Sequence, residues 1–259
     1  MGDLPRMRST APAKLLVAAG TLTGAYLLPG IAAAPGGRRV FRTVRNLDGL
    51  PAPGPGRVAL TFDDGPEPKA VEAFLEALAE LNVTATFFLV GEQVRRAPDA
   101  ARMIVAAGHE VACHGYRHKN HLRLSPQATV RDLTDARDVI VSETGAEIRH
   151  FRPPYGVFNL ASWLTAERLG WNRVLWAQWG RDWEPDATPE RIRQRLLSGV
   201  ADRDVLLLHD AEAYSSAGSW RRTLAALEPI VSELRARGLE PGPLGDIPPT
   251  VPGAHRAAR

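Results

Sequence analysis

The 259 residues are 44% hydrophobic and 24% charged, a composition that excludes a disordered chain, a collagen and a protein with several membrane spans. The net charge of +3 gives no indication of nucleic-acid binding, which needs a basic face within the folded domain. The single cysteine, Cys113, excludes an internal disulfide and, inside the apolar stretch HEVACH, indicates a buried core residue rather than a reactive thiol.

The first 34 residues predict a targeting segment. Basic residues precede an apolar stretch from Leu15 to Ala34 that ends in small side chains, which is the pattern of a secretory signal. The stretch is also long enough to span a bilayer as a helix, although Pro29 would kink that helix. We therefore expect an extracytoplasmic protein, either secreted after cleavage near residues 32–34 or anchored to the membrane by residues 1–34.

Three further segments follow. Residues 35–56 are rich in Gly, Pro and Arg and predict a linker. A single folded domain is expected over residues 57–246. Residues 247–259 are polar and contain proline, which predicts a flexible tail. The sequence does not indicate an oligomeric state.

Strand-like and helix-like segments alternate along the domain. Apolar runs rich in strand formers predict strands at 58–64, 84–91, 109–114, 148–154, 173–180 and 204–210, with a short seventh near Leu239. Helical periodicity predicts helices at 69–81, 92–107, 125–143, 159–169, from Pro189 onward and at 220–237. This alternation predicts a parallel sheet covered by helices, either a closed or nearly closed barrel or a doubly wound sheet. In both, polar residues at the carboxyl ends of strands gather in one site.

Two adjacent carboxylates end the first predicted strand, Asp63 and Asp64 in TFDDGP. They repel each other unless a cation or an arginine compensates, so metal binding by one and general-base catalysis by the other is a sensible division. The alternative is a capped turn before Pro66. His114 and His118 follow the third strand in HGYRH, with a spacing that suits Zn²⁺ or a similar ion.

One carboxylate and two imidazoles leave coordination positions for water and substrate, as a hydrolytic metal requires. Two further histidines are not expected to be ligands. His109 starts a strand and is expected to be structural, and His121 is expected to be a loop residue.

The later strand ends carry the remaining candidates. Arg152 in FRPPYG can pair with the free carboxylate, and the two prolines after it fix the backbone so that the Tyr155 amide can face a developing oxyanion. His209 ends the sixth strand and suits a general acid, with Asp182 in WGRDW orienting it or raising its pKa. Three tryptophans near this strand are either core residues or a stacking surface for a sugar ring: Trp176, Trp179 and Trp183.

Taken in order, TFDDGP, HGYRH, RPPY, RDW and LLLH resemble the five motifs of the polysaccharide deacetylase family, which is carbohydrate esterase family 4 or the NodB-homology domain. The resemblance runs from about residue 57 to 246. It implies a distorted (β/α)7 barrel that binds a glycan and hydrolyses N-acetyl groups on N-acetylglucosamine units of peptidoglycan, a chitin-like polymer or an oligosaccharide. It also implies a divalent cofactor, Zn²⁺ with Co²⁺ or another divalent ion as alternatives, held by Asp64, His114 and His118.

The same resemblance implies a role for each remaining candidate. Asp63 would be the general base, and Arg152 would orient it. His209 would be the general acid, tuned by Asp182. The amide of Tyr155 would stabilise the oxyanion, while Trp183 and Leu207 would line the acetyl pocket beside it.

Two positions depart from the family pattern. Gly115 replaces the hydroxyl residue of H-(S/T)-x-x-H, and Trp179 stands at the first position of D-x-x-D-W. Two alternative functions therefore accompany the main one. The first is O-deacetylation of a polysaccharide such as xylan. The second is a catalytically silent glycan-binding protein, which has no need of the full set of acid, base and metal ligands.

Overall fold

The computed structural model describes Tyr26 and residues 56–245. Apart from Tyr26, the predicted targeting segment lies outside the described residues, as do most of the predicted linker and the tail. The strands form one parallel sheet in the order β5-β4-β3-β2-β1-β7-β6, with β8 paired to β1. Their bounds are β1 Arg57–Asp63, β2 Thr86–Leu89, β3 Glu110–Cys113, β4 His150–Phe151, β5 Asn172–Arg173, β6 Gln178–Trp179, β7 Val205–His209 and β8 Glu240–Gly242.

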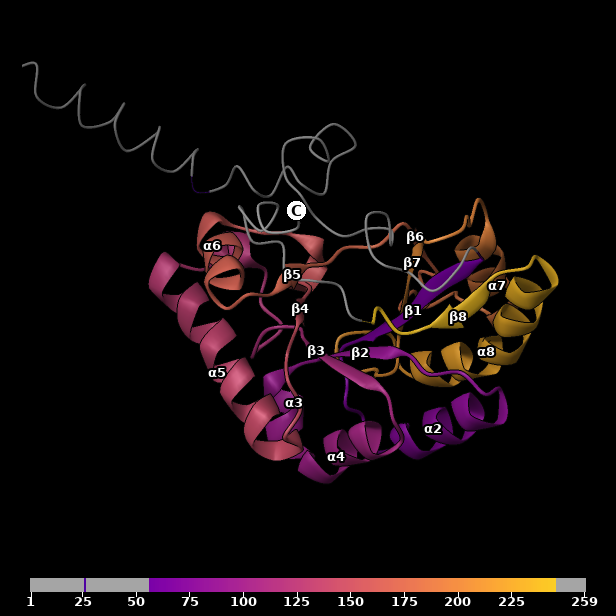
Figure 1. Ribbon diagram of the computed structural model, residues 1–259, viewed down its shortest axis with the longest axis horizontal. Coiled ribbons are helices and arrows are strands. Elements are labelled where there is room, and N and C mark those ends of the chain that lie inside the picture. The colour runs from indigo at the N-terminus through magenta and orange to yellow at the C-terminus, as the bar shows by residue number, and fades with distance from the viewer. Residues whose placement is uncertain (1–25, 27–55, 246–259) are drawn as a thin grey trace, which may run out of the picture.

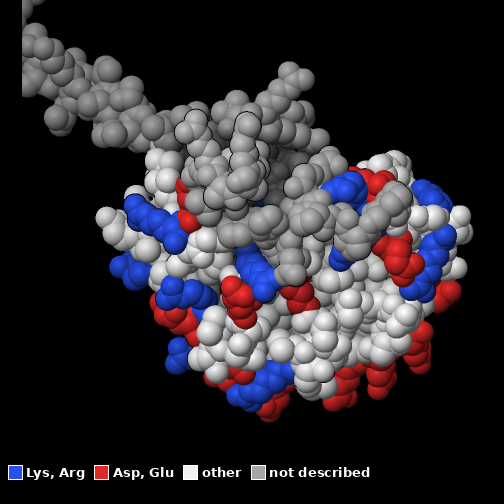
Figure 2. All heavy atoms as spheres, viewed as in Figure 1, with Lys and Arg blue, Asp and Glu red and all other residues white. Residues whose placement is uncertain are grey.

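The helices lie in an arc around the outer side of the curved sheet (Figure 1). They are α2 Val71–Glu80, α3 Gly91–Arg96, α4 Pro98–Ala106, α5 Pro126–Thr144, α6 Leu160–Arg168, α7 Pro189–Leu197 and α8 Ser219–Ala236, with short 3-10 turns η3 His121–Arg123 and η4 Pro154–Gly156. Charged side chains of both signs are interspersed over the described part of the face in Figure 2. The expected parallel α/β architecture is confirmed.

The curved sheet is an open barrel, because β5 and β6 are the two ends of the strand order. The predicted strand at 173–180 is wrong as one strand. Its first part bonds to β4, with Val174 N–H donating to Phe151 O (2.9 Å), and its second part bonds to β7, with Ala177 N–H donating to Val205 O (2.9 Å). The segment therefore crosses from one edge of the sheet to the other.

Prolines explain two other differences from the predicted elements. The helix predicted over 92–107 is broken into α3 and α4, because Pro98 begins α4 at a position that needs no N–H. The strand predicted over 148–154 pairs only at His150–Phe151, since the two prolines that follow cannot donate to a ladder.

The strands carry apolar side chains on both faces, and the two faces build separate clusters. A large cluster lies between sheet and helices and includes Leu60, Phe62 and Phe74. A small cluster on the other face contains Ala59, Phe88, Ala112, Val174, Val205 and Leu244. Because side chains alternate along a strand, Asp63 shares the inner face with Ala59. The inner face of β1 therefore changes from apolar at Ala59 to acidic at Asp63, its last residue.

None of the helices in the described ranges has the length and apolarity needed to cross a bilayer. Tyr26, the one described residue of the predicted targeting segment, contacts the domain. Its hydroxyl donates to Leu124 O (3.0 Å) and accepts from Asn159 Nδ2 (2.6 Å).

Candidate active site

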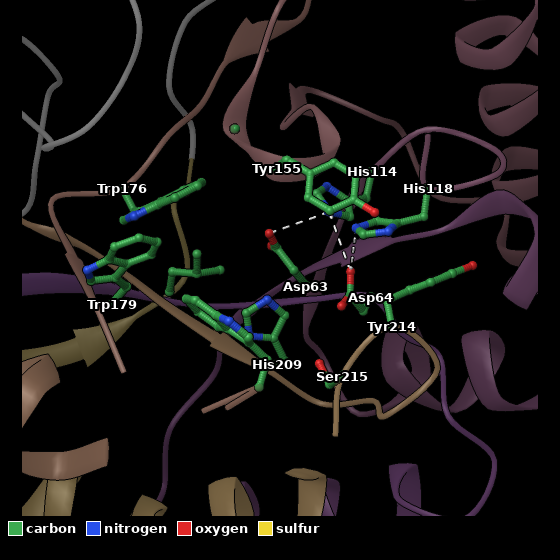
Figure 3. A pocket seen from close by; sticks show the side chains of 13 residues that line it. Asp63, Asp64, His114, His118, Tyr155, Trp176, Trp179, His209, Tyr214 and Ser215 are labelled. Atoms are coloured by element: carbon green, nitrogen blue, oxygen red, sulfur yellow. Dashed lines mark ion pairs between the residues drawn. The ribbon is translucent and has the colours of Figure 1, made fainter. Parts of the chain in front are cut away.

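A pocket of about 240 Å³ lies at the carboxyl ends of the central strands. Figure 3 shows Trp176 and Trp179 on one side of it and His114, His118 and Tyr155 on the other, with Asp63 and Asp64 between. The lining residues are Asp63, Asp64, His114, His118, Tyr155, Gly156, Trp176, Trp179, Trp183, Leu207, His209, Tyr214 and Ser215. Eight of the ten predicted site residues are among them. The other two, Arg152 and Asp182, are buried behind this lining.

Asp64, His114 and His118 form a group with the geometry of a metal site. Each offers one ligand atom, and these atoms lie within 4.8 Å of one another. Asp64 Oδ1 is 3.1 Å from His118 Nε2 and 3.5 Å from His114 Nε2, close to the separation of about 3.3 Å expected for two ligands of one tetrahedral Zn²⁺. Asp64 Oδ1 is also buried without a hydrogen-bond donor. These residues fit a divalent cation.

The protonation states of this group favour metal binding. Burial alone would raise the pKa of Asp64, but the short contact with His118 and the neighbouring imidazoles lower it to about 2. Burial lowers the pKa of His114 to about 4, against the opposing charge of Asp63. His114 Nδ1 lies 2.8 Å from Arg152 O, and donating to that carbonyl leaves Nε2 free to coordinate. Asp64 is therefore ionised and His114 neutral at pH 7.

Three site residues have a left-handed backbone conformation that side chains rarely adopt. Their φ angles are 83° at Asp64, 49° at His118 and 61° at Tyr155. Such conformations are unfavourable for residues other than glycine and concentrate at functional sites. Here they occur at two of the candidate ligands and at the residue whose amide is predicted to bind an oxyanion.

Asp63 is held by a fully buried arginine. Arg152 Nη1 donates to Asp63 Oδ1 (2.5 Å) and to Thr61 Oγ1 (3.0 Å), and Nη2 donates to Leu175 O (3.3 Å). The other carboxylate oxygen, Oδ2, lies 3.6 Å from His114 Nε2. One oxygen of Asp63 is therefore fixed by a charge-assisted bond, while the other faces the metal site.

His209, which is partly buried at the pocket wall, forms a pair with the fully buried Asp182. Asp182 Oδ1 accepts from His209 Nδ1 (2.8 Å), and Oδ2 accepts from the His209 N–H (2.7 Å) and from Thr223 Oγ1 (2.8 Å). Burial would lower the pKa of His209, but the charge of Asp182 and its hydrogen bond raise it to about 10. The imidazole is therefore protonated at neutral pH, and Nε2 carries the proton that is not committed to Asp182.

Asp132 on α5 is a site residue that sequence reasoning missed. Its carboxylate accepts the N–H groups of Tyr116 (2.9 Å) and Arg117 (3.2 Å), in the loop between the two candidate histidine ligands. A Cβ added to Gly115, where φ is +77°, would lie 2.7 Å from Asp132 Oδ2. Glycine at position 115 therefore leaves room for the Asp132 carboxylate. That carboxylate stabilises the loop by accepting two of its backbone N–H groups. No sequence signal distinguishes this aspartate from others on the helix.

The positions of two other residues near the site, His121 and Tyr214, were also not predicted from the sequence. His121 is fully buried in η3, with Nε2 3.9 Å from Asp132, so the expected loop residue is a core residue. Tyr214, in the loop after β7, stacks on His118 with ring centroids 4.1 Å apart. By contrast, His109 is structural as expected, because its Nδ1 accepts from the Ala85 N–H (3.2 Å). Cys113 is buried as expected.

Comparisons with known proteins point to one family. The family model for polysaccharide deacetylases matches residues 51–174. The chain is 35% identical to a chitooligosaccharide deacetylase of Bradyrhizobium sp. (strain ANU 289), over 73% of this chain and 90% of that protein. It is 33% identical to a peptidoglycan-N-acetylglucosamine deacetylase of Bacillus cereus, over 70% of this chain and 83% of that protein.

A solved structure shares the fold as well. The structure of a family 4 carbohydrate esterase from Streptomyces lividans in complex with acetate superposes with a TM-score of 0.65 at 32% sequence identity, over 72% of this chain and 92% of that one. Relatives above 30% identity that this chain covers almost completely establish the family. The chain belongs to the polysaccharide deacetylases of carbohydrate esterase family 4, and it is an enzyme of that class.

Proposed function

We propose that this deacetylase hydrolyses the N-acetyl groups of N-acetylglucosamine units in a glycan. The observation that carries the proposal is the placement of a carboxylate and an imidazole in one pocket with a group that can hold a metal ion. Asp63 is a carboxylate fixed by Arg152, and His209 is an imidazole kept protonated by Asp182. The names of the relatives support the substrate class, since they act on chitooligosaccharides and peptidoglycan.

Asp64, His114 and His118 would hold the divalent ion, for which Zn²⁺ suits two imidazoles and one carboxylate. Such an ion supplies Lewis-acid chemistry, lowering the pKa of water and polarising a carbonyl. Asp63 would take a proton from the attacking water through Oδ2, the oxygen that Arg152 does not hold. The guanidinium fixes the orientation of this carboxylate for that role through the hydrogen bond to Oδ1.

The leaving nitrogen needs a proton, because an amine departs far more readily than an amide anion. His209 Nε2 would donate that proton, as the nitrogen not bonded to Asp182. The Tyr155 N–H would stabilise the oxyanion. Trp183 and Leu207, which line the same pocket, would enclose the methyl group of the acetyl.

The direct test measures acetate release from N-acetylglucosamine oligomers and from peptidoglycan, with Zn²⁺ or Co²⁺ and after chelation. We expect release that chelation abolishes and added metal restores. Acetylxylan is the comparison substrate for the O-deacetylation alternative. Release from acetylxylan alone would contradict the proposal, and so would no release from folded, metal-loaded protein.

Asp182→Asn should move the alkaline limb of the pH profile to lower pH. The pKa of His209 is raised to about 10 chiefly by the charge of Asp182, and the acid works only while protonated. An amide removes that charge, so the imidazole loses its proton at lower pH. The measurement is kcat/KM for deacetylation from pH 6 to pH 10. Thr223→Val, which removes one hydrogen bond to Asp182 but no charge, should shift the limb much less. Equal limbs in wild type and Asp182→Asn would exclude His209 as the acid.

Asp132→Ala should weaken metal binding although Asp132 is not a ligand. Removing a group that orients ligands typically lowers metal affinity by about 10- to 100-fold, and Asp132 holds two amides of the ligand loop. Competition with a chromophoric Zn²⁺ chelator measures the affinity. Asp135→Ala, an exposed aspartate on the same helix, is the matched control and should bind Zn²⁺ normally. Unchanged affinity in Asp132→Ala would show that the loop holds its geometry alone.

Export of the protein is part of the proposal. Residues 1–34 would be the targeting segment and 35–56 a linker to the catalytic domain at 57–246, with a flexible tail at 247–259. The apolar stretch between basic residues supports this. The mass of the mature protein in culture medium and membrane fractions tests it. Loss of about the first 34 residues identifies a cleaved signal, and full-length protein in the membrane identifies an anchor. Full-length protein only in the cytosol would contradict export.

A further inference from the structure

Three tryptophans, Trp176, Trp179 and Trp183, line the pocket and form a continuous aromatic wall. Figure 3 labels Trp176 and Trp179, which lie side by side. The ring centroids of Trp176 and Trp179 are 5.7 Å apart, and those of Trp179 and Trp183 are 5.2 Å apart. Trp183 in turn lies 5.3 Å from the His209 ring. The row of rings therefore starts beside His209, the candidate acid. Trp183 is the ring next to His209, and Trp179 is the second ring.

Trp179 is the exposed member of this wall. It is 41% exposed although it lines the pocket. Other large hydrophobic side chains this exposed in the described ranges are Tyr155, which also lines the pocket, and isolated aliphatic residues on or near helices: Leu122, Val130, Val141 and Leu164. Single exposed aliphatic residues are ordinary on a protein surface. An exposed indole beside a catalytic pocket instead marks a surface that a ligand can cover.

The fold does not need Trp179 for its core. Trp179 is in β6, the edge strand, and pairs in register with Leu207 of β7. Its side chain therefore faces the inner side of the sheet, as Leu207 does, away from the layer between sheet and helices. Trp179 belongs to neither of the apolar clusters formed by the described residues.

The chemistry of this surface suits a sugar ring. A pyranose presents C–H groups on its faces and hydroxyl groups around its edge. An indole offers a broad, electron-rich face for the C–H groups. The rim beside it is charged, with the Arg181 guanidinium 5.8 Å from the Trp179 ring and paired to Glu184. Such groups can hydrogen-bond to hydroxyls at the edge of a stacked ring.

We propose that Trp179 is a stacking platform for the sugar unit next to the one being deacetylated, and that it sets a preference for oligomeric over monomeric substrates. This inference rests on the proposed function. The Trp183 ring contacts both the His209 ring (5.3 Å) and the Trp179 ring (5.2 Å). A unit stacked on Trp179 therefore lies one ring farther along the wall from His209 than a unit stacked on Trp183. A monosaccharide in the reacting position leaves Trp179 exposed, whereas a longer chain covers it.

The test compares the affinity of N-acetylglucosamine oligomers, from monomer to hexamer, for the Zn²⁺-loaded Asp63→Asn protein by calorimetry. Calorimetry of this variant reports binding without turnover. We expect affinity to rise with chain length, and Trp179→Ala in the same background to remove about 10-fold of that gain. Trp179→Phe should retain most of it. Leu164→Ala, at an exposed leucine on α6, is the control and should match its parent at every length.

A second measurement covers the case in which the doubly substituted protein folds poorly. Initial rates are measured for Trp179→Ala, without the Asp63 substitution, on substrates from monomer to hexamer. We expect a raised KM for the longer chains, so that KM depends less on chain length than it does in the wild type. Equal length dependence in wild type and Trp179→Ala would overturn the inference while leaving the deacetylase function intact. An equal loss for monomer and hexamer would overturn it too, since it indicates local damage. Failure of the unsubstituted protein to bind or turn over any oligomer would overturn both proposals.

Discussion

Asp63→Asn is expected to lower kcat for acetate release by about 10²- to 10⁴-fold, the range that a positioned general base contributes, while the protein keeps its divalent metal. The amide still accepts from Arg152 but takes no proton from water. Its oxygen is also not needed as a ligand, because Asp64 supplies the carboxylate of the ligand group. Acetate release and metal content, measured on the same preparation, check both halves of the expectation.

Asp64→Asn is the comparison variant for Asp63→Asn. It is the same chemical change one residue along the chain, but we expect it to lower metal content as well as activity. Loss of metal in Asp63→Asn with retention in Asp64→Asn would reverse the assignment of the two carboxylates. Full activity in Asp63→Asn would remove Asp63 from the mechanism.

His114→Ala is expected to abolish activity through loss of the metal. It removes one of the three candidate ligand atoms, which lie within 4.8 Å of one another. We expect Zn²⁺ affinity to fall by more than the roughly 100-fold that is typical when a group that only orients a ligand is removed. Metal analysis after dialysis and calorimetric titration with Zn²⁺ provide the measurement.

His109→Gln is the matched histidine control for this variant. Gln retains an acceptor for the Ala85 N–H, which His109 Nδ1 now accepts, and His109 has no part in the ligand group. We expect normal Zn²⁺ binding and normal acetate release. Wild-type metal content in His114→Ala would show that this histidine is not a ligand.

Much of the site could be predicted because its residues follow buried strands. Parallel strands end at one edge of a sheet, so polar residues after different strands meet there. The register shows this directly, with Asp63 of β1 paired to His209 of β7. The alternation of strand and helix likewise predicted the architecture, since the continuous apolar runs left no polar strand face.

The features that sequence did not predict depend on contacts between distant segments. Asp132 meets the ligand loop from a helix, and Thr223 meets Asp182 from 41 residues away. Nothing local marks either residue among its polar neighbours. The division of 173–180 into β5 and β6 has the same origin, because it depends on which strands lie at the two edges of the open sheet.

The left-handed backbone at Asp64, His118 and Tyr155 lowers the stability of the fold. Glycine would adopt these φ angles without steric conflict, and each such change would relieve unfavourable backbone energy of about 1–3 kcal/mol. Glycine at these three positions would therefore relax the backbone. The chain instead retains a carboxylate, an imidazole and a phenol there. Asn82, Arg181 and Arg203 share this conformation, so the unfavourable backbone energy is not confined to the candidate site. At Asp64, His118 and Tyr155, however, a glycine that relaxed the backbone would also remove a side chain that lines the pocket.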